Sequence, residues 1–231
     1  MPNWISKLIS NFTTNPLSET SVHYIQQHTP LYIHISTEGS RTNTKSGGRW
    51  TISLSDGTAI VSGWNSDFVQ MTDINSHHSE RYASVVSLTF LERYCNNFSL
   101  RLLNHIEEFC DNKSYVTKLN ELKSNAYYKL LICKIKEHEA YLALLNIPLK
   151  NLHLTQVKEH QDDFKNTAEL TTPEQLNIED DIIATSKVKP PLNIPLPSVP
   201  LAIYVNQKYI HLNFQQRIRE SCFENEAKIF L

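Results

Sequence analysis

The sequence of 231 residues contains no long apolar run and no closely spaced cysteines. A transmembrane helix needs about 18 or more consecutive apolar residues, so none is expected and no membrane partner is predicted. The cysteines form no C-x-x-C pair, which argues against a zinc site and against a disulfide scaffold. We therefore expect an intracellular protein, cytoplasmic or nuclear, that is not secreted. The four cysteines are Cys95, Cys110, Cys133 and Cys222.

A strong excess of one charge is also absent. The formal net charge is −2, from 22 basic and 24 acidic residues, so we expect no strong non-specific attraction to nucleic acid. A nucleic-acid partner would have to be bound through a local patch, helped by metal ions. Apolar residues make up 40% of the chain and aromatic residues 10%, which is enough for a proper core.

Glycine is scarce and confined, because all five glycines lie between residues 39 and 63. Glycine supplies the positive-φ positions of tight turns, so this stretch is expected to be rich in hairpins. Residues 31–36 alternate apolar and polar side chains as a strand does. Residues 49–55 and 58–64 flank Asp56-Gly57, a strong hairpin signal. Three consecutive strands with short connections predict an antiparallel meander.

Beyond residue 77, helical patterns alternate with shorter strand-like segments. The order of three strands followed by α-β-α-α-β-α predicts a mixed sheet flanked by helices, that is, an α/β domain. Thr172 is expected to cap the last of these helices, with Pro173 at its first position. The other helices are predicted at 79–94, 112–122 and 127–145, and the strands at 100–110 and 152–157.

Four segments are predicted along the chain. The first is interpreted as a docking helix rather than a membrane anchor, because its apolar residues recur at helical spacing. These residues are Trp4, Ile5, Leu8, Ile9 and Phe12. The proline-rich stretch is expected to be extended and semi-rigid. The segments are a docking helix with a linker (1–30), the main domain (31–188), a proline-rich linker (189–200) and a hairpin followed by a helix (201–231).

Four acidic residues occupy informative places in this scheme. Glu38 follows the first predicted strand, Glu80 opens the first helix, Asp111 ends the fourth strand and Asp181 lies in the last helix. Ends of neighbouring strands and adjoining helix starts lie close together, so these carboxylates can converge. Converging carboxylates repel each other, and oxygen-only ligands select Mg²⁺ or Mn²⁺ over zinc. Two such ions about 3.5–4 Å apart would clamp the attacking and leaving oxygens of a phosphodiester displacement.

Five short motifs surround these residues and resemble, in order, those of one family. The motifs are STEGS (36–40), SHHSERYA (76–83), CDNKS (110–114), VKEHQDD (157–163) and LNIEDDIIA (176–184). Together they resemble the type 1 ribonuclease H domain of retroelement reverse-transcriptase polyproteins, over roughly residues 31–186. The resemblance implies a ribonuclease H-like fold, a mixed five-stranded sheet made of the antiparallel meander plus two parallel strands.

The resemblance also implies an activity, namely cleavage of the RNA strand of RNA–DNA hybrids with two Mg²⁺ (or Mn²⁺) ions. By the family pattern, the metal ligands would be Glu38, Glu80, Asp111 and Asp181. His160 matches the family histidine that assists proton transfer or product release. The partners would be an RNA–DNA hybrid and an upstream reverse-transcriptase domain in a polyprotein.

Three departures from the family pattern bear on activity. Glu38 stands where the family has Asp, His78 where it has Arg, and Glu159 where it has Gly. One extra methylene displaces a carboxylate by about one bond, and misplacements of roughly 1 Å can cost about 100-fold in rate. The departures suggest a diverged enzyme or a decaying copy. The alternatives are a catalytically inactive module that binds nucleic acid or protein and, less favoured, an exonuclease or transposase-like nuclease.

Simpler interpretations compete for several residues near these motifs. Asp111 is also a good helix N-cap, a role that stabilises by about 1 kcal/mol. Asn112 and Ser114 could contact a sugar or phosphate, or could cap the same helix. Glu80 could simply be a favourable charge at a helix N-terminus.

Two pairs of neighbouring residues leave the choice between adjacent positions open. Asp180 competes with Asp181 for the family position. His77 and His78 resemble a metal pair, but adjacent residues on a helix do not face one way, so we interpret them as a solvated helix entry.

Overall fold

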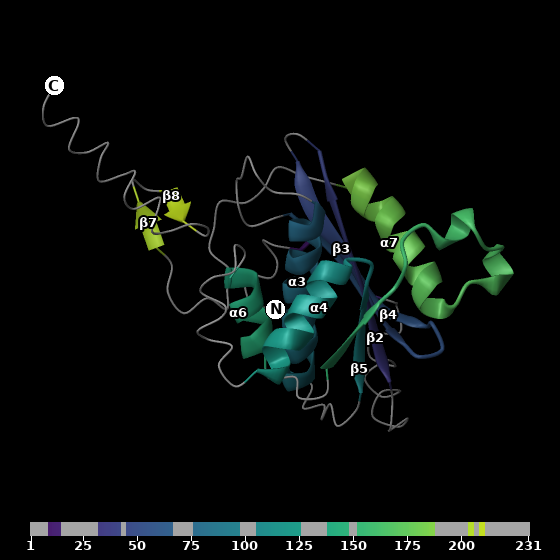
Figure 1. The fold of residues 1–231 in the computed structure, drawn as a ribbon, viewed down its shortest axis with the longest axis horizontal. Helices are drawn as coiled ribbons and strands as arrows, with labels where there is room; N and C mark the ends of the chain where they lie inside the picture. The colour runs from purple at the N-terminus through teal and green to yellow at the C-terminus, as the bar shows by residue number, and fades with distance from the viewer. Residues whose placement is uncertain are drawn as a thin grey trace, which may run out of the picture.

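The computed structural model describes nine stretches of the chain, and Figure 1 shows them as a sheet with helices on both faces. The described residues are 9–14, 32–42, 45–66, 76–97, 105–125, 138–147, 152–187, 203–205 and 208–210. Within these stretches, no helix combines the length and apolar character needed to cross a membrane.

The main sheet has six strands in the order β1-β4-β3-β2-β5-β6. β2, β3 and β4 form the predicted antiparallel meander, and β5 and β6 run parallel to β2. The predicted mixed sheet, an antiparallel meander plus two parallel strands, is therefore confirmed, and β1 adds a sixth strand. The strands are β1 (Ile9–Thr14), β2 (Ile33–Arg41), β3 (Ser46–Leu54), β4 (Ala59–Ser66), β5 (Ile106–Cys110) and β6 (Leu152–Gln156).

The hairpin between β3 and β4 forms where Asp56-Gly57 predicts it. Gly57 has a φ of +87°, and its N–H donates to the carbonyl of Leu54 over 3.0 Å. Asp56 Oδ1 accepts the N–H of Thr58 over 2.8 Å. The glycine is needed because most residues avoid a positive φ.

The sixth strand, β1, corrects one prediction. Residues 9–14 were expected to continue a docking helix, but they pair antiparallel with β4, with Phe12 opposite Gly63. Without this pairing β4 would be an exposed edge with unpaired backbone groups. Pairing of that edge therefore outweighs the local helical spacing. Residues 1–8 lie outside the described residues.

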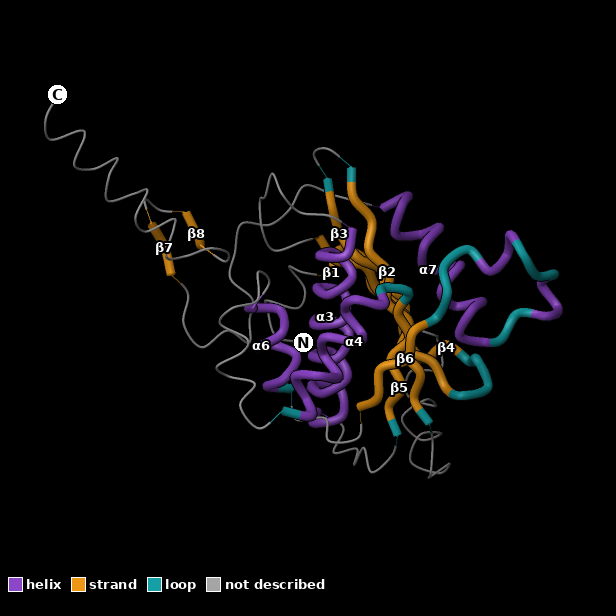
Figure 2. Tube along the Cα trace, in the orientation of Figure 1, coloured by secondary structure: helices purple, strands orange, loops and turns teal. Residues whose placement is uncertain are grey.

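Helices cover both faces of the sheet. Figure 2 shows α3, α4 and α6 on one face and α7 on the other. The helix predicted at 79–94 corresponds to α3, which is longer than predicted. The helix predicted at 127–145 overlaps α6, and residues 126–137 lie outside the described part of the chain. The helices are α3 (Ser76–Asn97), α4 (Lys113–Ser124), α6 (His138–Asn146) and α7 (Thr172–Lys187), with two short 3-10 helices, η1 (Gln161–Asp163) and η2 (Thr167–Glu169).

The hydrophobic core lies between the sheet and the α3, α4 and α6 layer. Its largest fully buried side chains include Trp50, Tyr82, Tyr115 and Tyr141. The inward-facing residues of β2 are Ile33 and Ile35, as the alternation in the sequence predicts. This packing holds α3 against β2 and β3, and α4 against β6.

The C-terminal hairpin is also present. β7 (Ile203–Val205) pairs antiparallel with β8 (Lys208–Ile210). The proline-rich linker and the helix predicted after the hairpin lie outside the described residues. The four segment boundaries stay predictions.

Candidate metal-binding active site

The register of the central strands brings Glu38 and Asp111 together. In the parallel pair β2–β5, Ile33 lies opposite Ile106 and Ser36 opposite Phe109. The same offset, continued for two residues, sets Asp111 level with Glu38. Parallel strands end at the same edge of a sheet, so both carboxylates lie at one edge.

A close approach of α3 to β3 brings Glu80 to the same place. A Cβ on Gly48 would lie 2.5 Å from Ala83 Cβ and 3.1 Å from the Glu38 carbonyl oxygen, so only glycine fits there. The first turns of α3 can therefore lie directly over β2 and β3. Glu80 is buried, and the Cys110 thiol donates to its Oε2 over 3.7 Å.

Helix α7 contributes from the other face of the sheet. Asn177 Nδ2 donates to Glu38 Oε1, and Asp181 follows one turn later. Asp180 instead faces the sheet, where it accepts Thr51 Oγ1 over 2.8 Å and Arg49 Nε over 3.2 Å. It is only 1% exposed. The choice that the sequence left open therefore falls to Asp181 as the acid that faces the other carboxylates.

His160 lies in the segment between β6 and α7. Its φ is 53°, which makes it the one non-glycine residue with a positive φ in the described part of the chain. Histidine is among the residues enriched in that conformation. The side chain is mostly exposed, with Nε2 4.0 Å from Glu159 Oε2.

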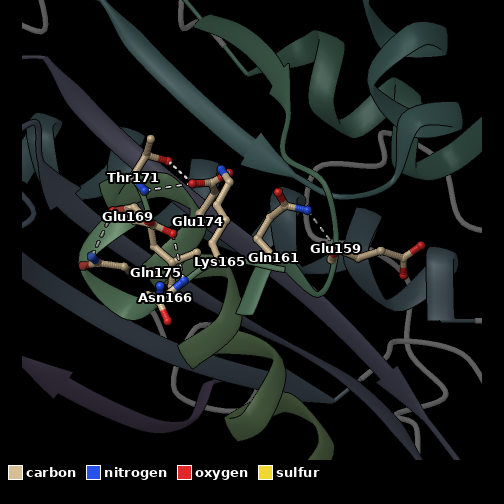
Figure 3. Close-up of polar contacts among 9 residues, drawn as sticks. Glu159, Gln161, Lys165, Asn166, Glu169, Thr171, Glu174 and Gln175 are labelled. Carbon is tan, nitrogen blue, oxygen red and sulfur yellow. Dashed lines mark hydrogen bonds and ion pairs between the residues drawn. The ribbon is translucent and has the colours of Figure 1, made fainter. Parts of the chain in front are cut away.

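Hydrogen bonds and one ion pair order the rest of this segment (Figure 3). Lys165 Nζ lies 2.6 Å from Glu174 Oε1, and Thr171 donates its N–H and its hydroxyl to Glu174 Oε2. These contacts hold the pKa of Glu174 at about 2, with the Lys165 hydrogen bond as the largest cause. α7 begins at Thr172, so Thr171, whose N–H donates to Glu174, stands at the N-cap position that was predicted for Thr172.

One pocket of about 250 Å³ collects all five predicted catalytic residues. We call it the carboxylate pocket. Sequence reasoning assigned no site role to His77, Glu159 or Asn177, which also line its wall. His77 lies three residues before Glu80, and Asn177 four before Asp181, so helical spacing was a usable signal for both. The five predicted catalytic residues that line the carboxylate pocket are Glu38, Glu80, Asp111, His160 and Asp181.

The pocket brings carboxyl groups close together away from water, where their ionised forms repel each other. Burial and then the charges of Asp111 and Glu80 raise the pKa of Glu38 well above its usual value. Burial and then Asp111 raise the pKa of Glu80 to about 8. The pKa of Asp111 is raised by burial and then by Glu159, while His77 and His160 oppose the rise.

A divalent cation would relieve this repulsion, and the donor atoms suit one. Within the described residues, one group of potential metal ligands lies within 4.8 Å: Glu80, Cys110 and Asp111. Burial and nearby carboxylates raise the pKa of the Cys110 thiol well above its usual value, so the thiol stays protonated. The carboxylate oxygens remain as donors, and these fit Mg²⁺ or Mn²⁺.

Asn112, not Asp111, caps α4. Its Oδ1 accepts the N–H of Tyr115 over 3.0 Å, and its side chain also lowers the pKa of Glu80. Asn112 is buried, which argues against the predicted sugar or phosphate contact. Ser114 is exposed on α4 and does not line the pocket, so its contact stays a prediction.

The two adjacent histidines separate as predicted. His77 is 53% exposed at the pocket, whereas His78 is buried, with its ring 4.4 Å from the ring of Tyr82. The interpretation as a solvated helix entry is therefore wrong for His78. Its burial follows from the start of α3 at Ser76, which turns His78 towards the core.

Comparisons of the chain with known proteins found similarity to solved structures alone. No protein-family model and no curated protein matches the sequence. The chain is similar to LC11-RNase H1, solved in complex with an RNA/DNA hybrid, at 15% identity and a TM-score of 0.40, covering 56% of this chain and 87% of that one. It is also similar to RNase H1 from the archaeon Halobacterium salinarum NRC-1, at 14% identity and a TM-score of 0.39, covering 64% and 98% of the chains.

A viral polyprotein gives a further likeness. The prototype foamy virus protease-reverse transcriptase is similar at 12% identity and a TM-score of 0.44, and the match covers 68% of this chain and 21% of that one. At these identities the likeness concerns the arrangement of helices and strands and transfers no activity.

Proposed function

We propose that this chain is a ribonuclease H-type nuclease that cleaves the RNA strand of RNA–DNA hybrids. The observation that carries the proposal is the convergence of Glu38, Glu80, Asp111 and Asp181 in one pocket. The sequence motifs around them favour descent from a retrotransposon polyprotein, with an upstream reverse-transcriptase domain as a partner.

Glu38, Glu80, Asp111 and Asp181 would hold two divalent cations, Mg²⁺ or Mn²⁺. When bound, such ions supply Lewis acidity that activates an attacking water and stabilises the leaving oxygen. Glu38 would hold a cation together with Glu80, Asp111 and Asp181, because all four line the same pocket. Asn177 orients its carboxylate from α7.

His160 would act at the mouth of the pocket. Its ring is mostly exposed, and its charge lowers the pKa of Asp111, so it lies close to the carboxylates while remaining accessible to a substrate. We assign it the proton delivered to the leaving 3′ oxygen, with a 5′-phosphate as the other product. Preference for RNA would come from contacts to 2′-hydroxyls across a shallow minor groove.

One observation favours the second candidate, a catalytically inactive binding module. Glu38 Oε1 already accepts the Asn177 hydrogen bond, and Glu38 is only 4% exposed. The longer glutamate side chain is thus held by α7, where the family aspartate would be shorter.

The test is cleavage of a labelled RNA–DNA hybrid in Mg²⁺ or Mn²⁺. We expect wild-type protein to cleave, Asp111→Asn and Asp181→Asn to lose about 100-fold or more, and Asp180→Asn to retain activity within a few fold. Asp180→Asn is the matched control, because it neutralises the adjacent acid outside the pocket.

Glu38→Asp separates the two candidates. An inactive wild type together with cleavage by Glu38→Asp would support the binding module. Equal cleavage by wild type and Asp111→Asn would show that the activity does not come from this pocket and would overturn the proposal.

A further inference from the structure

His77 belongs to the carboxylate pocket, but the proposed function gives it no role. It lies in the first turn of α3, three residues before Glu80, so the two side chains share one face of the helix. Its Nδ1 lies 3.6 Å from Glu80 Oε1. A nitrogen donor therefore stands beside an oxygen donor at the mouth of the pocket.

We propose that His77, through Nδ1, is a ligand together with Glu80 for one cation of this pocket, and that it shifts the selectivity of the site towards first-row transition ions such as Mn²⁺ over Mg²⁺. The inference rests on the proposed function, because it places a cation in the same pocket. It adds a ligand that the family resemblance does not assign to this chain.

The distance suits a shared ion. Nitrogen and oxygen donors each about 2.1 Å from one cation lie roughly 3.0–3.5 Å apart for angles between about 90° and 110°. A small rotation of the exposed imidazole would shorten the observed 3.6 Å between His77 Nδ1 and Glu80 Oε1 to this range. Mg²⁺ prefers oxygen ligands and dehydrates reluctantly, whereas imidazole is a good ligand for transition ions.

The position of His77 is defined by its neighbour. His78 is buried against the ring of Tyr82, which fixes the start of α3 relative to the core. Adjacent helical residues point about 100° apart, so burial of His78 leaves His77 on the side of the pocket.

His160, the other imidazole that lines the pocket, is placed differently. Its Nε2 lies 4.0 Å from Glu159 Oε2, on its own segment. His77 instead stands beside Glu80, with Nδ1 3.6 Å from Glu80 Oε1. Of the two imidazoles, His77 is therefore the one placed to share a cation with Glu80.

Binding of Mn²⁺ to metal-free protein tests the proposal without any substrate. Pulsed electron paramagnetic resonance detects an imidazole ¹⁴N bound to Mn²⁺, and titration gives the dissociation constants for Mn²⁺ and, by competition, Mg²⁺. The variants are His77→Ala, His160→Ala and His153→Ala. His153 is the matched control, an exposed histidine of β6 outside the pocket.

We expect the nitrogen signal in wild type, His160→Ala and His153→Ala, and its loss in His77→Ala. The Mn²⁺ dissociation constant should rise by about 10-fold or more in His77→Ala, and that for Mg²⁺ by less than about 3-fold. A signal that survives in His77→Ala, or an equal weakening of both ions, would overturn the proposal.

Asp111→Asn distinguishes this failure from failure of the proposed function. If Mn²⁺ binds in a way that Asp111→Asn abolishes, but without a His77 nitrogen signal, the nuclease proposal stands and the ligand role of His77 falls. If wild-type protein binds no Mn²⁺ that depends on Asp111, both fall.

Discussion

Replacing Glu108 by glutamine is expected to remove a pH dependence of stability that originates in the core. Glu108 lies on β5, fully buried, and is surrounded by hydroxyl donors from three elements. Ser84 on α3 donates to its Oε1, as does Thr37 on β2 over 3.5 Å. Tyr115 on α4 donates to Oε2 over 3.5 Å. Lys123, also on α4, is the nearby charge.

Burial raises the pKa of Glu108 from its usual 4.5 to about 7, and the hydroxyls and Lys123 only partly oppose this rise. The folded protein therefore keeps a proton that the unfolded chain releases above about pH 4.5. Between about pH 4.5 and 7 the free energy of unfolding should fall by roughly 1.4 kcal/mol per pH unit, about 3 kcal/mol in all. Below this window the group contributes no penalty, and above it the penalty is constant.

Urea unfolding of wild type and Glu108→Gln between pH 4.5 and 8, without divalent cations, isolates this group. The difference in stability, variant minus wild type, should rise by about 3 kcal/mol across the window. Glu121→Gln is the control, since Glu121 is an exposed residue of α4 paired with Lys118 over 3.3 Å. A difference for Glu108→Gln that does not change with pH would refute the reasoning.

Three further predictions concern the pocket, the α4 cap and the β3–β4 turn. Asp111→Asn should raise thermal stability in EDTA, because it removes a carboxylate whose pKa is raised by burial. Saturating Mn²⁺ should stabilise this variant less than wild type. Binding of Mn²⁺ at about 100 times its dissociation constant stabilises the wild type by about 2.7 kcal/mol. Asn112→Ala should cost about 1 kcal/mol in urea unfolding through loss of the α4 cap, whereas Ser114→Ala should stay within about 0.5 kcal/mol. Gly57→Ala should lower the melting temperature, with a cost of roughly 1 kcal/mol or more, because φ is +87° and a Cβ would lie 3.0 Å from Thr172 Cγ2. An Asn112→Ala variant as stable as Ser114→Ala, or a Gly57→Ala variant as stable as wild type, would contradict the geometry described for these sites.

The fold was predictable where a single local rule applied. Asp56-Gly57 predicts the β3–β4 hairpin because few residue pairs adopt a two-residue hairpin turn. The strand β1 was not predictable, because Ile9 and Phe12 recur at helical spacing and lack the alternation of a strand. Only the pairing of Phe12 opposite Gly63, a contact distant in sequence, decides between them.

At the site, the sequence located the acids but not the direction of neighbouring side chains. Asp111 and Asn112 are both good caps, and the choice depends on the helix starting at Lys113. Asp180 and Asp181 differ only through the rotation of α7, which sets Asp180 against Arg49 and Thr51. Such choices between adjacent positions depend on packing, which the one-dimensional pattern does not contain.

We propose that Glu38, Glu80, Asp111 and Asp181 form one divalent-cation site. Anomalous scattering from crystals of the wild-type protein grown with Mn²⁺ would locate such ions. We expect Mn²⁺ peaks bounded by these four residues, and their loss in Asp111→Asn crystals. Wild-type crystals at saturating Mn²⁺ with no peak among these four residues would contradict the proposal.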